Sequence, residues 1–480
     1  MSTHQTGSRI SLDSGNAARR TTRPPVFKSP VWAKAAFLAT QRLRRSGSLP
    51  LLDQIKDTPF WAPERVLEYQ FARLKSLLEH AEAHVPYYRE LFKSIGMTAR
   101  DIRSFDDFSR IPVLTKETVR ERLSDLVRED VPPQSFIKHH SGGSTGIPLT
   151  FYRDRLYLDA SDAGVFRNLS QSGWRPGELI AFFWGWDETL YRMPRWKFEL
   201  RQRARRTYQF DPFNSGPEQM SRWAERWRSL RPTVALGYAS TIARFAAHVE
   251  STGANVRPLR GVFTTAEKLY PHQRWLISRV FQCKVYDCYG SSEIQNIAVE
   301  CAAGNMHINA DFAVVELENG SAFSEASMPL ILTSLWNYSM PFIRYRNEDW
   351  GELVDGRCSC GNNFPLMSLN VSRLSDNILL PGGRVVHGEF FTHLMYGIEG
   401  VQSFQFHQTA ADTIVIRFVA LKEGTALRTQ RIDHMLEKIR ALSPEPLNII
   451  VQQVDEIPLS SAGKHRFTLS DVISSASGQG

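Results

Sequence analysis

Short apolar runs alternate with segments of helical periodicity in the middle of the chain. Residues 179–184, 233–238, 259–265 and 285–289 are apolar stretches bounded by glycine or polar residues, which is typical of buried strands. Residues 241–250, between two of these runs, have the spacing of an amphipathic helix. Strands that alternate with helices predict βαβ units and a parallel sheet covered by helices.

The two ends of the chain have different patterns. Apolar residues recur at helical spacing within residues 64–95, which predicts two helices, and residues 31–48 predict a short amphipathic basic helix. Near the C-terminus we expect strands and one helix, at residues 404–406, 413–419, 429–442 (the helix) and 447–454. The predicted fold class is α/β, with a large N-terminal domain of parallel-rich sheets and helices and a small α+β C-terminal domain.

Composition and charge narrow the class of protein. The chain has 480 residues, 42% hydrophobic and 22% charged, as expected for a globular protein of two or more domains. Its net charge of +8 fits nucleic acid, an anionic membrane surface or an anionic substrate. No nucleic-acid-binding motif accompanies the charge, so we expect no nucleic-acid partner. No apolar run is long enough for stable membrane insertion, and residues 1–30 read as a disordered basic tail without a signal peptide.

One glycine-rich stretch indicates an anion site. It consists of Ser141, Gly142, Gly143, Ser144, Thr145 and Gly146, followed by Ile147 and Pro148. Glycines let backbone N–H groups approach a ligand, and consecutive N–H groups form a nest for phosphate oxygens. The stretch is not a P-loop, because no Gly-Lys-Ser/Thr follows, and an ordinary flexible hairpin is the alternative.

Four further motifs follow this loop in order. They are Thr265-Ala266-Glu267, Tyr289-Gly290-Ser291-Ser292-Glu293, the stretch 341–349 (PFIRYRNED) and Gly463-Lys464. Together with the loop, they resemble the motif series of the adenylate-forming (acyl-CoA synthetase) superfamily, and most closely its phenylacetate–CoA ligase and CapK branch. The resemblance covers the chain from about Glu64 to Arg466.

The resemblance implies an ATP site with Mg²⁺. The glycine-rich loop would hold the β- and γ-phosphates, and Ala266 and Glu267 would lie beside adenine, with Thr265 in place of the family glycine. Tyr289, with Gly290, would stack on the purine. Ser292 would bond the α-phosphate and Glu293 would hold Mg²⁺, which prefers oxygen ligands.

The second half of the implied site spans two domains, 31–372 and 373–480. Asp349 would accept hydrogen bonds from the ribose hydroxyls, although Glu348 replaces the glycine that the family has before it. Arg373 would contact ribose or phosphate, and Asp376 would be the hinge. Lys464, on the small mobile domain, would supply positive charge to the α-phosphate during catalysis.

Five cysteines in a chain this long argue against a disulfide framework and for a reducing cytoplasm. Cys301, His307, Cys358 and Cys360 form a Cys₃His set that is standard for structural zinc, and similar residues recur in the resembled branch. The alternative is four free side chains. Cys283 and Cys288 are expected in buried strands.

The function implied is ATP-dependent activation of a carboxylic acid through an acyl-adenylate, followed by transfer to an acceptor. The resemblance favours coenzyme A as the acceptor, although the residues themselves leave an amine or a hydroxyl open. The acid and a possible homodimer are not readable from the sequence. Trp184 and Tyr238 are candidates for the acid pocket. Alternatives are a CapK-type ligase that acylates a saccharide or amine in surface-polysaccharide synthesis, and a catalytically silent nucleotide-binding relative.

Overall fold

The computed structural model describes residues 31–140, 149–185, 193–212, 215–318, 328–369, 378–381, 385–386, 391, 394–395, 401–420, 429–443, 445–458 and 466–472. The predicted tail 1–30, the glycine-rich loop, Arg373, Asp376 and Lys464 lie outside the described residues. None of the described helices is long and apolar enough to cross a membrane.

The N-terminal part is helical, as predicted. Its helices are α1 (Val31–Leu43), α2 (Ser48–Ile55), α3 (Pro63–His84), α4 (Pro86–Ser94), α5 (Phe105–Ser109) and α6 (Lys116–Glu121). The break between α3 and α4 falls at Val85, which is extended, because the residue before a proline avoids the helical conformation. The buried face of α3 carries Leu74, Leu77 and Leu78, so the predicted amphipathic pattern is confirmed.

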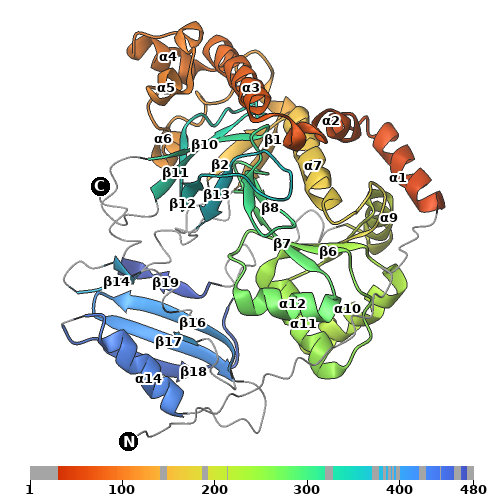
Figure 1. Ribbon diagram of the computed structural model, residues 1–480, viewed down its shortest axis with the longest axis vertical. Helices are drawn as coiled ribbons and strands as arrows, with labels where there is room; N and C mark the ends of the chain where they lie inside the picture. Colours follow the sequence, from red (N-terminus) through yellow and green to blue (C-terminus); the bar gives the residue numbers. More distant parts are fainter. Residues whose placement is uncertain are drawn as a thin grey trace, which may run out of the picture.

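A mixed sheet of eleven strands forms the centre of the large domain. Its parallel half has the order β4 (Thr207–Phe210), β3 (Ile180–Phe183), β5 (Val234–Tyr238), β6 (Gly261–Thr265) and β7 (Lys284–Tyr289). The last four are the predicted apolar runs, and the edge strand β4 was not predicted. Helices α10 (Pro217–Leu230), α11 (Ala239–Thr252) and α12 (Pro271–Phe281) cover one face (Figure 1). Helices α7 (Arg155–Ser170) and α9 (Arg195–Arg205) lie on the other side.

The other half of the sheet is antiparallel. From β7 outward it contains β8 (Ala298–Glu300), β9 (Met306–Ile308), β13 (Leu366–Leu369), β12 (Tyr345–Val354), β11 (Met328–Ser334) and β10 (Ala313–Leu317). The prediction of a parallel-rich sheet therefore holds for one half only. Cys288 lies in β7 and Cys283 just before it, and both are half-buried rather than fully buried as expected.

A separate hairpin flanks the glycine-rich loop. Strand β1 (Ile137–His140) pairs antiparallel with β2 (Thr150–Arg153), and His140 lies opposite Thr150. The glycine-rich stretch therefore connects two paired strands.

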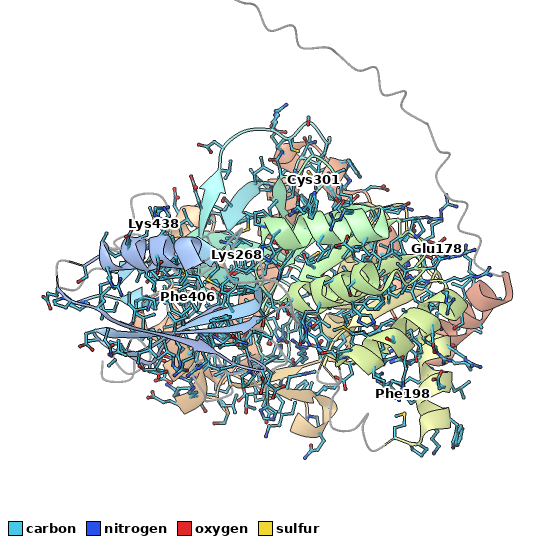
Figure 2. All side chains as sticks on the ribbon, turned by 90° about the horizontal axis from the view of Figure 1, so that it is seen from below. Glu178, Phe198, Lys268, Cys301, Phe406 and Lys438 are labelled. Atoms are coloured by element: carbon cyan, nitrogen blue, oxygen red, sulfur yellow. The ribbon has the colours of Figure 1, made fainter. Side chains whose placement is uncertain are left out.

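The small domain is α+β. Its sheet has the order β18 (Asn448–Gln453), β17 (Thr413–Ala420), β16 (Val401–Ala410) and β19 (Thr468–Ser470), with the short pair β14 (Ile378–Leu379) and β15 (Val385–Val386) beside it. Helix α14 (Thr429–Arg440) packs its Met435 and Ile439 into this core. Figure 2 shows the small domain with Phe406 and Lys438 on one side, and the helices of the parallel half on the other.

Candidate active site

A cavity of about 1520 Å³ lies where the parallel strands end at their carboxyl side. Ligands of open α/β sheets bind at this edge, because the loops that follow the strands converge there. Its wall includes Thr265, Ala266 and Glu267 after β6, the turn 289–293 after β7, and Arg466, Phe467 and Thr468 of the small domain. The cavity therefore lies at the junction of the two domains.

The turn after β7 positions Ser292 and Glu293. Ser291 donates from its backbone N–H to the carbonyl of Ile294 at 2.8 Å, and the backbone N–H of Ile294 donates to the Ser291 hydroxyl at 3.0 Å. The guanidinium of Arg153 donates to the Ser292 carbonyl. Glu293 is buried at the cavity wall, and Arg153 is the cation beside it.

A bulge in β12 positions Asp349. Trp350 pairs with Pro329 and Arg346 with Ile331, so three residues of β12 lie opposite one residue of β11. Bulges of this kind re-aim side chains next to functional sites. The Oδ2 atom of Asp349 accepts hydrogen bonds from the Tyr289 hydroxyl at 2.8 Å and from Nδ2 of Asn347 at 2.6 Å. The bulge thus joins two of the predicted nucleotide-site residues directly.

The departure at Glu348 leaves this geometry intact. Glu348 has a φ of +68°, the left-handed conformation for which glycine is the usual choice. Its carboxylate pairs with Lys116 at 2.5 Å. The turn that the family glycine would permit therefore forms with glutamate in its place.

The Thr265–Glu267 turn is tied to a helix N-terminus. Ala266 has a φ of +67°, which turns the chain sharply after β6. The two carboxylate oxygens of Glu267 accept hydrogen bonds from the backbone N–H of Ser240 at 2.8 Å and from its hydroxyl at 3.0 Å. Ser240 is in the first turn of α11, whose dipole stabilises a negative charge there.

Aromatic side chains cover the sheet face of the cavity. The rings of Trp184 and Tyr238 lie 4.5 Å apart, and the ring of Phe182 stacks on Trp184 at 5.5 Å. Leu236 and Phe263 continue this apolar wall. Burial, with the nearby Glu267, raises the pKa of Tyr238 well above its usual value. Trp184 and Tyr238 therefore line the cavity, and their role in binding the acid stays a prediction.

Three charged residues at the cavity were not predicted. Burial raises the pKa of Asp287 to about 7, although its carboxylate accepts a hydrogen bond from the Thr264 hydroxyl at 3.0 Å. Arg274 pairs with Glu300 at 2.6 Å, and Glu300 also accepts the backbone N–H of Asp287 at 3.0 Å. These residues come together only through the pairing of neighbouring strands, so no local sequence pattern predicts them.

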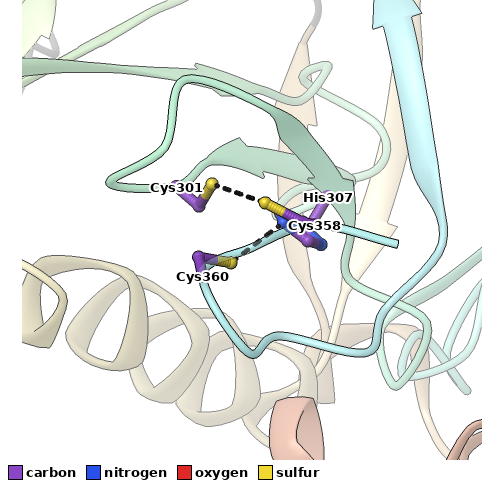
Figure 3. Close-up of side chains that lie close together, drawn as sticks. All are labelled: Cys301, His307, Cys358 and Cys360. Carbon is purple, nitrogen blue, oxygen red and sulfur yellow. Dashed lines mark hydrogen bonds between the residues drawn. The ribbon is translucent and has the colours of Figure 1, made fainter. Parts of the chain in front are cut away.

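The Cys₃His set is assembled as predicted (Figure 3). Sγ of Cys301 lies 3.6 Å from Sγ of Cys358, and Sγ of Cys360 lies 3.4 Å from Nε2 of His307. All four ligand atoms lie within 4.8 Å of one another. In a tetrahedral zinc site with bonds of about 2.3 Å, ligand atoms are roughly 3.8 Å apart, so this set fits zinc.

Hydrogen bonds around the cluster orient the candidate ligand side chains. Nδ1 of His307 lies 3.0 Å from the Phe364 carbonyl, which can only accept, so Nδ1 carries the proton and Nε2 presents its lone pair to the cluster. Backbone N–H groups of Ala303 and Asn362 donate to the sulfurs of Cys301 and Cys360. Burial raises the pKa of the Cys360 thiol. A metal ion binds the thiolate, so its binding would have to supply the free energy of removing that proton.

The amino-acid sequence is similar to those of CapK and of phenylacetate–coenzyme A ligase over most of its length. Residues 378–471 match the CapK C-terminal domain. CapK from Staphylococcus aureus is 21% identical over 431 residues, 85% of this chain and 90% of that protein. Phenylacetate-coenzyme A ligase from Escherichia coli K12 is 24% identical over 431 residues, 84% of this chain and 95% of that protein.

A solved structure has the same fold. The crystal structure of 2-hydroxyisobutyryl-CoA ligase in its postadenylation state superimposes with a TM-score of 0.67 and 18% identity, over 85% of this chain and 90% of that one. The likeness confirms the predicted fold class. The relatives and the matched C-terminal domain confirm the resemblance that the ordered motifs indicate, to the adenylate-forming superfamily and within it to the branch of the phenylacetate–CoA ligases and CapK.

Proposed function

We propose that the chain activates a carboxylic acid with ATP and passes the acyl group to coenzyme A. A carboxylate oxygen attacks the α-phosphorus, the bond from that phosphorus to the bridging oxygen breaks, and pyrophosphate leaves. Attack by the acceptor thiol on the acyl carbon then releases AMP. The observation that carries the proposal is the hydrogen-bonded group of Tyr289, Asn347 and Asp349 on the wall of one cavity, beside Glu293 and the Thr265–Glu267 turn.

The resemblance suggests a role for each of these residues, and their place on one wall supports it. Asp349 would bind ribose, and its bond from Tyr289 orients the carboxylate before the nucleotide arrives. Tyr289 and Gly290 would lie against the purine with Ala266 and Glu267. Ser292 would donate to the α-phosphate, and Glu293 would hold Mg²⁺, whose charge offsets that of the phosphates.

The proposed site also draws on residues outside the described parts of the chain. The glycine-rich loop, Ser141–Gly146, would hold the β- and γ-phosphates, and Arg373 would contact the nucleotide. Lys464 would stabilise the pentavalent α-phosphate, and rotation of the small domain about Asp376 would then withdraw it. The hairpin of β1 and β2 supports this proposal, because His140 and Leu149, the described residues on either side of the loop, both line the cavity.

Zinc is the proposed ligand of the Cys₃His set. Four ligand atoms of the right types at near-tetrahedral spacing support it. The metal would join the turn after β8 to the loop between β12 and β13, and so hold both next to the cavity that Asn305 and Met306 line. Its proposed role is structural.

A CapK-type ligase that acylates a saccharide or amine is the second candidate. The relative CapK and the match to its C-terminal domain favour it as much as the ligases favour coenzyme A. A silent nucleotide-binding relative is less well supported, because the sequence retains Glu293, Asp349 and Lys464. We further propose that the protein acts in the cytoplasm, where ATP is available.

The test is pyrophosphate release from Mg·ATP with a panel of aryl, fatty and hydroxy acids, using hydroxylamine to trap the adenylate. Turnover with one acid, lost in Lys464→Ala and Asp349→Ala, is the expected result. Coenzyme A and amines would then be compared as acceptors, which separates the two candidate ligases. Failure of the purified chain to bind ATP would overturn the assignment.

A further inference from the structure

A set of arginines lines the cavity away from the proposed nucleotide site. Arg44 follows α1, Arg155 begins α7, and Arg201 and Arg205 lie in the second half of α9. We call this set, with Asp159 and Asp162 of α7, the arginine recess. Its side chains come from α7, α9 and the turn after α1, and they line the same cavity as the aromatic wall of Phe182, Trp184 and Tyr238.

The arginines of the recess outnumber its acids. Only Arg155 forms an ion pair, with Asp159 at 3.1 Å. Within the described parts of the chain, Arg44, Arg201 and Arg205 have no ion pair or side-chain hydrogen bond. Asp162 offsets part of the charge on Arg205 and Arg44, but four guanidiniums against two carboxylates around one hollow leave an excess of positive charge.

Protein surrounds these charges even though water reaches them. Arg205 and Asp162 are both accessible to solvent, as expected on the wall of a water-filled hollow. Burial, together with repulsion from Arg44 and Arg201, lowers the pKa of Arg205 to about 10. The guanidiniums of the recess thus repel one another and are partly desolvated. An anion bound among them would offset this unfavourable free energy.

We propose that the arginine recess binds an anionic group, a carboxylate or a phosphate, carried by one of the two substrates. The inference rests on the proposed function for the identity of those substrates. Arginine suits this role because its planar fork donates two parallel hydrogen bonds to a carboxylate or phosphate. Because the aromatic wall lines the same cavity, the substrate would combine an apolar portion with a charged end.

The anion belongs either to the acid, as a second charged group at the end opposite the reacting carboxylate, or to the acceptor. Two matched comparisons distinguish these sources. For the acid, succinate is compared with butyrate and adipate with hexanoate, in pyrophosphate release with hydroxylamine. For the acceptor, coenzyme A is compared with pantetheine, which lacks its phosphates.

The chain offers matched variants for both comparisons. Arg205→Ala removes one recess charge, whereas Arg203→Ala removes an exposed charge from the same helix outside the cavity. Asp162→Asn removes a negative charge from the recess and should act in the opposite direction. We expect the kcat/KM preference for the anionic partner to fall about tenfold in Arg205→Ala, to rise in Asp162→Asn, and to stay unchanged in Arg203→Ala.

Loss of the diacid preference would assign the anion to the acid, and loss of the coenzyme A preference would assign it to the acceptor. If neither ratio changes in Arg205→Ala, the proposal is wrong. A binding readout keeps it testable should the chain show no turnover. Adipate or coenzyme A should then raise the thermal unfolding midpoint of wild type and Arg203→Ala, but raise it less in Arg205→Ala. Equal shifts, or none, would also overturn it.

Discussion

At the scale of single residues, two positions beside the cavity have backbone conformations that glycine adopts more easily. Ala266 and Glu348 have φ values of +67° and +68°. A left-handed conformation costs a residue with a Cβ roughly 1–2 kcal/mol. At Glu348, the ion pair with Lys116 offsets part of this strain. At Ala266, the hydrogen bond from Ser240 of α11 to the next residue, Glu267, stabilises the turn. Strain of this kind is typical of functional turns.

The strain at Glu348 can be measured with two substitutions that both remove the ion pair. Glu348→Gly and Glu348→Ala differ only in the Cβ atom. We expect the glycine variant to be more stable than the alanine variant by about 1 kcal/mol, because only glycine adopts this φ freely. Urea unfolding of the two variants gives the difference. Greater stability of the alanine variant, the ordinary order in strands, would show that the turn carries no strain.

Asp287 makes stability depend on pH. Its pKa of about 7 in the folded chain, raised by burial, compares with about 3.9 when unfolded. Between these values the folded chain keeps a proton that the unfolded chain has lost. The stability contributed by this group therefore falls as the pH rises from about 4 to about 7, and is constant above that.

Asp287→Asn removes this titration while keeping an oxygen for the Thr264 hydroxyl. The variant should gain stability relative to wild type between pH 5 and pH 8, on the order of 2 kcal/mol after allowance for the partial exposure of the side chain. Denaturant unfolding at both pH values measures it. A difference between the two proteins that is independent of pH would contradict the assigned pKa.

At the scale of elements, the proposed zinc ion would strengthen the short pairing between β9 and β13. Strand β13 pairs with β9 through two residue pairs, and the cluster lies at the end of that contact. Cys360→Ser should lower zinc content from one ion per chain to near zero. It should also lower the free energy of unfolding by at least ~2 kcal/mol, because metal binding adds to folding stability.

Metal analysis and urea unfolding measure both effects, and chelation of the wild type should reproduce them. Cys283→Ser is the matched control, since Cys283 is not in the cluster. Its zinc content should equal that of wild type. Full zinc occupancy in the Cys360→Ser variant would exclude Cys360 as a ligand.

Elements were predictable where one local pattern decides them. Strands β3, β5, β6 and β7 were predictable because buried strands are continuous apolar runs between turns. The edge strand β4 was not predicted, since only Phe210 of its four residues is fully buried. Helix α7 was not predicted, because it is buried on several sides and carries polar residues there. Its Arg167, for example, is buried and bonds Asp311 and Asn309, which are far along the chain.

The candidate site, like the elements, was predictable only where a local sequence pattern indicates a residue. Motif order indicated Tyr289 and Asp349 as neighbours in function, but the bulge that joins them depends on the register of β12 against β11. Asn347 and Arg153 were missed for this reason, since Asn347 bonds Tyr289 at the end of β7 and Arg153 bonds Ser292 in the turn that follows it. The Cys₃His set was found because its residue types alone suggest a metal.

At the scale of the whole molecule, a ring contact joins the small domain to the large one at the cavity. Phe467 meets Tyr270 of the large domain edge-to-face at 4.8 Å, and Arg466 and Thr468 line the cavity beside it. Figure 2 shows Lys268, next to this contact, between the two domains. Phe467 is three residues from Lys464, so the contact limits where the proposed catalytic lysine can lie.

Tyr270→Ala should therefore slow adenylation about tenfold and slow transfer from preformed acyl-adenylate less, because only the first step is proposed to need Lys464 at the α-phosphate. Tyr270→Phe keeps the ring and is the control. Single-turnover rates of the two steps, measured separately, give the result. An equal loss in both steps would mean that the contact stabilises the molecule as a whole. A loss confined to adenylation would show that it selects one of two domain positions.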